Sequence, residues 1–185
     1  NLSFLSRIGN ALVAYAAYVG QMLHPSGLAV LYPHPGNQLS VWTVGLCGVF
    51  MSLLSVGVVR WQRKRPYLLV GWLWYLGMLV PVIGFLQVGS HARADRYTYL
   101  PHLGLYFMLA WGAVDLCGEW RGRRVALPAA AVMILTGLLV LSHIQTRYWR
   151  DSVSLWTHTL ACTSENYFAH NNLGNALAER GTLNA

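Results

Sequence analysis

The segment His91–Pro101, with the sequence HARADRYTYLP, carries the residues best suited to chemistry in this chain. Arg93, Asp95 and Arg96 lie within four residues of one another, between two long apolar runs. Charged groups at the edge of a membrane-spanning segment often mark a functional site, because hydrocarbon does not solvate them. Guanidinium groups bind phosphate oxygens in a bidentate manner. The segment therefore predicts a phosphate-binding site at one face of a membrane.

Arg96 is the first candidate for holding a phosphate group there, with Arg93 as the second candidate and Arg150 as an alternative. The tyrosines nearby can donate hydroxyls or stack on a ligand, and histidine is a side chain that can titrate near neutral pH. The candidates for lining the site are His91, Asp95, Tyr97, Tyr99 and His102. A simpler interpretation is that Asp95 pairs with Arg96 or caps the next helix, while the tyrosines anchor the chain at the membrane interface.

Composition places the chain in a membrane. Of its 185 residues, 55% are hydrophobic and 10% are charged, whereas soluble domains carry about 25% charged residues. The formal net charge is +7, but the basic residues fall in clusters between apolar runs, so no nucleic-acid partner is predicted. Three cysteines at different depths, Cys47, Cys117 and Cys162, predict no disulfide.

Five apolar segments can position the site. They cover residues 8–23, 41–59, 67–88, 98–116 and 125–144. The first would reach about 24 Å as a helix, short of a hydrocarbon core of about 30 Å, so it either spans at a tilt or lies partly in the membrane plane. Pro81 would kink the third segment, with or without a functional consequence.

Loop charge predicts the orientation. Residues 60–65 and 121–124 hold seven basic side chains, and two apolar segments separate the two clusters, which therefore share a side. The positive-inside rule places them in the cytoplasm and places 91–101 on the opposite face. Asp115 and Glu119 are predicted to pair with the basic residues of 121–124.

The chain is predicted to be an integral multi-pass membrane protein. It would lie in a bacterial inner membrane with the C-terminal segment in the periplasm, or in the endoplasmic reticulum membrane with that segment in the lumen. The proline-rich loop 24–40 would face the same side. Its His24 and His34 form too sparse a set for a metal site, so no metal ligands are predicted.

The last 39 residues read as a separate module. Asp151 or Ser152 can cap a helix that ends near Cys162, and a second helix fits 166–180, ended by Gly181. The sequence NLG at 172–174 matches the first half of a tetratricopeptide repeat. The predicted fold is all-α: a polytopic transmembrane helical bundle over 1–146, followed by a tetratricopeptide-repeat-like hairpin over 147–185.

A single repeat cannot bury its apolar face, so further repeats are expected. The chain does not begin with Met and has no signal-peptide pattern, and it ends inside the predicted repeat. We therefore expect it to be part of a longer protein.

The chain resembles the transmembrane-and-tetratricopeptide-repeat O-mannosyltransferase-like family of GT-C glycosyltransferases. The similarity covers nearly the whole chain and rests on four motifs in the family's order. These are WLWYLGMLVP at 72–81, ADRYTYLP at 94–101, YWRDSxxLW at 148–156 and NYFAHNNLGNAL at 166–177.

The resemblance implies transfer of a sugar, often mannose, from a polyprenyl phosphate to a protein acceptor on the non-cytoplasmic face. It implies no cofactor beyond the donor substrate, and a divalent metal stays open. The expected partners are membrane lipid, the polyprenyl-phosphate sugar and a protein bound by the repeats. The family's catalytic carboxylate lies in an earlier external loop, so no catalytic residue is assigned. The alternative is a non-enzymatic membrane-anchored repeat scaffold; a transporter is disfavoured because the spans carry almost no charge.

Overall fold

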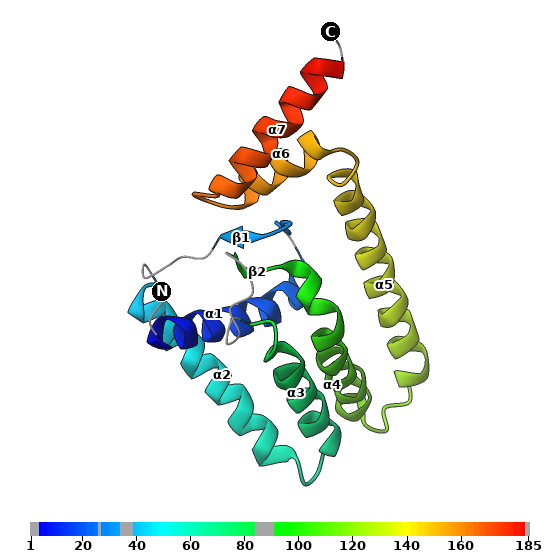
Figure 1. The fold of residues 1–185 in the computed structure, drawn as a ribbon. Helices are drawn as coiled ribbons and strands as arrows, with labels where there is room; N and C mark the ends of the chain where they lie inside the picture. Colours follow the sequence, from blue (N-terminus) through cyan, green and yellow to red (C-terminus); the bar gives the residue numbers. More distant parts are fainter. Residues whose placement is uncertain (1–3, 26, 34–38, 84–90, 184–185) are drawn as a thin grey trace.

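The computed structural model describes residues 4–25, 27–33, 39–83 and 91–183. Helices make up most of this part of the chain, which confirms the all-α class (Figure 1). The α-helices are α1 (Phe4–Leu23), α2 (Val41–Trp61), α3 (Pro66–Leu79), α4 (Tyr99–Cys117), α5 (Arg123–Arg147), α6 (Ser152–Cys162) and α7 (Tyr167–Leu183), and a 3-10 turn, η1 (Asp95–Thr98), leads into α4. Among the described helices, α2, η1 with α4, and α5 are long and apolar enough to cross a membrane.

Helix α1 lies across one end of the other helices instead of beside them (Figure 1). The Tyr75 hydroxyl, near the end of α3, donates to the Tyr15 carbonyl at 2.6 Å. His102 Nε2, near the start of α4, lies 3.0 Å from the Tyr18 carbonyl. Because α2, α3 and α4 alternate in direction, these contacts meet at a single end of the bundle that α2–α5 form. Helix α1 is not among the described helices that are long and apolar enough to cross a membrane.

Replacing Tyr75 with phenylalanine tests this junction. The side chain is fully buried, so the change removes a buried hydrogen bond between α3 and α1. We expect a loss of about 1–2 kcal/mol in the free energy of unfolding, measured by thermal or denaturant unfolding in detergent. The same change at Tyr99, which is 78% exposed, provides the control and should leave the melting temperature unchanged.

Helix α3 is shorter than the sequence predicted. It has 14 residues and ends at Leu79, two residues before Pro81, so the proline ends the helix instead of kinking it. The amides of Val82 and Ile83 still bond to the Leu79 carbonyl in a closing turn. Proline lacks an amide hydrogen and disfavours helical geometry in the residue before it. The rest of the predicted segment, 84–88, lies outside the described residues.

Helices α3 and α4 pack through two glycines. A Cβ at Gly71 would overlap the Gly104 carbonyl oxygen, and a Cβ at Gly104 would overlap the Gly71 carbonyl oxygen. Small residues permit this close approach, which membrane helices use because apolar burial alone does not drive them together in lipid. The backbones of α3 and α4 therefore approach each other closely at these positions.

A two-stranded antiparallel ribbon was not predicted. Strand β1 (Tyr32–Pro33) pairs with β2 (His91–Arg93), with Tyr32 opposite Arg93 and Pro33 opposite His91. The first strand lies in the loop for which only turns were expected. The ribbon crosses above α1, so it joins both predicted outward segments into one structure (Figure 1).

In the C-terminal segment, the two helices α6 and α7 pack against each other and form a hairpin. Asp151 Oδ1 accepts the Ser154 amide at 2.9 Å, which confirms the expected N-cap. The expected end at Gly181 is wrong, because α7 continues to Leu183; an interior glycine costs a helix only about 1 kcal/mol. The hairpin lies at the ribbon end of the bundle (Figure 1).

Candidate functional site

A groove of about 820 Å³ opens at the ribbon end of the structure, between the loop after α1, the start of α4 and the last turns of α5. Its apolar lining includes Tyr106, Leu138 and Leu141, which lie further from this end along their helices. The polar side chains that line it gather toward the end itself: Asp95, Arg96, Tyr99, Ser142, Gln145 and Thr146. The groove is therefore apolar along the helices and polar at the ribbon end.

The three candidate arginines do not converge on one site. Arg96 is exposed and lines the groove. The Arg93 guanidinium lies 4.3 Å from the centre of the Tyr32 ring and lines a separate cavity of about 320 Å³. Arg150 lines a third cavity, of about 610 Å³, beside α7. Only Arg96 of the three is placed to contact a ligand in the groove.

Asp95 fixes the wall of the groove. Its Oδ1 accepts a hydrogen bond from Gln21 Nε2 at 3.1 Å, and its Oδ2 accepts one from the Ala29 amide at 2.9 Å. The Tyr32 hydroxyl lies 3.3 Å from the same Oδ2. Burial, reinforced by the charge of Asp95, raises the pKa of Tyr32 to about 12, so its hydroxyl stays protonated and can donate. One carboxylate therefore connects α1, the following loop, β1 and η1.

These contacts correct the simpler interpretation of Asp95. Within the described residues, the carboxylate forms no ion pair with Arg96. It does not cap α4 either, because no described side chain forms a capping hydrogen bond at the start of this helix. Both carboxylate oxygens accept hydrogen bonds from neutral donors, so Asp95 has a structural role in the wall of the groove.

The other predicted lining residues divide between groove and core. Tyr99 is exposed and lines the groove. Tyr97 packs against the hydrophobic core, and His102 is buried against α1. The backbone of His91 pairs in β2, and its side chain lies outside what the structure describes.

Neither α5 nor the loop after α1 was predicted to contribute to the site. Gln145 Nε2 donates to the Leu28 carbonyl at 3.1 Å, and His158 Nε2 lies 3.1 Å from the same oxygen. Asn166 Nδ2 donates to the Leu31 carbonyl at 3.4 Å. The polar run SHIQT at 142–146, at the end of an apolar span, was the available signal.

No cluster of three or more His, Cys, Asp or Glu side chains suited to a metal occurs in the described part of the chain, and His34 lies outside it. The three cysteines are free, as expected.

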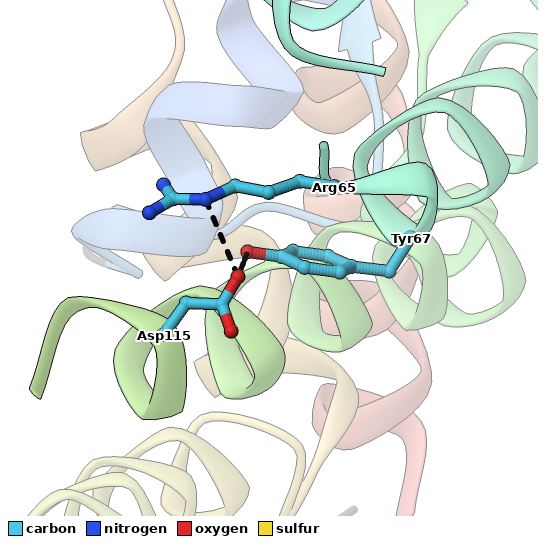
Figure 2. Close-up of polar contacts among 3 residues, drawn as sticks. All are labelled: Arg65, Tyr67 and Asp115. Carbon is cyan, nitrogen blue, oxygen red and sulfur yellow. Dashed lines mark hydrogen bonds and ion pairs between the residues drawn. The ribbon is translucent and has the colours of Figure 1, made fainter. Parts of the chain in front are cut away.

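The opposite end of the bundle carries a different polar cluster (Figure 2). Arg65 Nε lies 3.3 Å from Asp115 Oδ2, and the Tyr67 hydroxyl donates to the same oxygen at 2.8 Å. The predicted pairing of Asp115 with the basic residues of 121–124 is therefore wrong. Arg123 instead donates to the Gly118 carbonyl and closes the α4–α5 turn.

Comparison of the chain with protein-family models, with curated proteins and with solved structures gives no match. The geometry of the groove therefore carries the functional inference.

Proposed function

We propose that this chain belongs to a membrane glycosyltransferase-like protein that uses a polyprenyl-phosphate-linked sugar, with mannose as the sugar class and a protein as acceptor. The polar ends of α4 and α5 would face the non-cytoplasmic side, and the α6–α7 hairpin would begin a tetratricopeptide-repeat domain there. The donor would lie in the groove with its hydrocarbon against α4 and α5.

The placement of Arg96 carries this proposal. A lipid phosphate needs an apolar surface for its chain and a cation near the membrane interface for its headgroup. In the groove, Leu138, Leu141 and Tyr106 provide the apolar surface, and Arg96 provides the cation. A guanidinium there would neutralise the negative charge on the phosphate that leaves when the sugar is transferred.

Alanine substitution of the three candidate arginines, one at a time, tests the assignment. Hydrogen bonds to a charged group contribute about 1.5–3 kcal/mol, so Arg96→Ala should weaken donor binding on the order of 10- to 100-fold. Arg93→Ala and Arg150→Ala remove the same group from other cavities and should have little effect. Crosslinking of a photoreactive polyprenyl-phosphate mannose to the full-length protein in membranes provides the measurement.

Equal crosslinking in all three variants would contradict the role of Arg96. Equal loss in all three would indicate that the substitutions act through folding, which the melting temperature of each variant checks. Sugar transfer to protein acceptors in the same membranes then separates an enzyme from a protein that only binds the lipid.

A second candidate function is a membrane-anchored scaffold that binds proteins. The observation that favours it is the apolar exposure on α7, where Tyr167 is 68% and Leu177 is 51% exposed. If the protein acts only as a scaffold, it should keep its protein partner when Arg96 is replaced. It should lose that partner when Leu177 is replaced by aspartate.

A further inference from the structure

The end of the bundle opposite the groove gathers most of the positive charge of the membrane segment. It is formed by the α2–α3 turn and the α4–α5 turn, which lie at the lower end of Figure 1. Together with the adjoining helix ends they carry seven basic side chains against two carboxylates, Asp115 and Glu119. We call this region the basic end.

The basic end is held together as one surface. Arg65 from the α2–α3 turn and Tyr67 from α3 both contact Asp115 near the end of α4 (Figure 2). The contact fixes the spacing between the two turns. Because Asp115 pairs with Arg65, its negative charge does not neutralise the other basic side chains at this end.

Most of the other basic side chains at this end are free to bind an anionic ligand. Arg123 is used to close its own turn. The remaining five are exposed and form no hydrogen bond or ion pair with another described residue: Arg60, Arg63, Lys64, Arg121 and Arg124.

The surface next to these cations is apolar. Trp61 and Trp120 are 56% and 60% exposed beside the two turns. Directly beyond them, α2, α4 and α5 expose large hydrophobic side chains along their length, and no residue of the most apolar stretch of α5 is buried. A partner for this surface must present negative charge and hydrocarbon side by side. An anionic phospholipid carries both in one molecule, whereas the backbone of a nucleic acid presents charge without hydrocarbon chains.

We propose that the basic end binds the headgroups of anionic phospholipids, whose acyl chains lie against α2, α4 and α5. The guanidinium and ammonium groups would contact the lipid phosphates, and the two tryptophans would lie at the level of the headgroups. This inference is independent of the sugar-donor groove, which lies at the other end of the bundle.

The test compares two charge-matched double variants of the purified chain in a neutral detergent. Arg63→Gln with Arg124→Gln removes one exposed cation from each turn of the basic end. Arg147→Gln with Arg180→Gln removes two arginines from the other end. Native mass spectrometry with added phosphatidylglycerol or phosphatidylcholine measures the affinity of each lipid.

The wild-type chain should prefer phosphatidylglycerol to phosphatidylcholine. Each basic residue near an anionic lipid surface contributes about 1 kcal/mol, about fivefold in affinity, so the first pair should weaken phosphatidylglycerol binding tenfold or more. The second pair should change it by about twofold at most, because exposed charges far from the lipid are screened. Melting temperatures of both pairs should match the wild type, since all four side chains are exposed.

Three results would overturn the proposal. The first is equal affinity of the wild type for the two lipids, and the second is an equal loss in both double variants. The third is displacement of the bound lipid by glycerol 3-phosphate or by polyglutamate at comparable concentration, which would assign the surface to a soluble phosphate or to an acidic polypeptide. If the first pair fails to fold, Arg60→Gln with Arg121→Gln replaces it.

Discussion

Leucine in place of Gly71 is expected to separate α3 from α4 and to leave little folded protein. Even a Cβ at this position would overlap the Gly104 backbone carbonyl. A backbone atom cannot rotate away as a side chain can, so the helices themselves must move apart. Overpacking of a core costs about 1–3 kcal/mol when side chains can adjust. We expect alanine at Gly71 to reach the upper end of that range and leucine to exceed it.

Gly77 gives a matched control in the same helix. A Cβ there meets no atom within 4 Å, so Gly77→Ala and Gly77→Leu should leave stability unchanged or raise it slightly. Yield of monodisperse protein and melting temperature in detergent measure both series. If Gly71→Leu melts like Gly77→Leu, the close contact between α3 and α4 does not exist.

Asp95→Ala is expected to have the second largest effect. The change removes the acceptor for Gln21, Ala29 and Tyr32 together. A buried donor left without a partner costs about 1–3 kcal/mol, and bonds to a charged acceptor lie at the upper end. The Tyr32 hydroxyl still accepts from Gln21 and the Ala29 amide and can donate to the Gly27 carbonyl. We therefore expect a loss of about 2–3 kcal/mol in the free energy of unfolding, from the charged acceptor that is removed.

Asp151→Ala is the control for Asp95→Ala. Asp151 accepts one exposed hydrogen bond, from the Ser154 amide, and its removal should cost about 1 kcal/mol. Hydrogen exchange separates the two effects by location. Asp95→Ala should speed exchange of the Ala29 amide, whereas Asp151→Ala should speed exchange of the Ser154 amide alone. Slow exchange at Ala29 in the Asp95 variant would show that another group holds the loop.

The large effect expected for Asp95→Ala follows from the groups that the carboxylate contacts in the folded structure, not from the residues next to it in the sequence. In the segment HARADRY it stands beside two arginines, and charge pairing was a reasonable expectation. The carboxylate instead turns toward donors from α1 and the loop after it, more than 60 residues earlier. The guanidinium of Arg93 meanwhile lies against Tyr32, so neighbouring residues in the chain end in different cavities.

The sequence by itself determined most of the helices, one N-cap and the membrane character, because each depends on a short stretch of residues. The uncharged run of α2, the N-cap Asp151 and the polar end of α5 are all local features that composition and spacing reveal. The same holds for the separation of basic turns from the predicted site, since charge must lie outside hydrocarbon.

Only the tertiary structure decided which of these features meet. It laid α1 across the bundle, paired β1 with β2 and assembled the groove from three segments distant in the chain. Such contacts depend on how helices pack, and packing depends on shape at positions such as Gly71 and Gly104 that no periodic pattern marks. The physical reason is that composition and periodicity act over a few residues, whereas a site is made by distances between residues far apart in the chain.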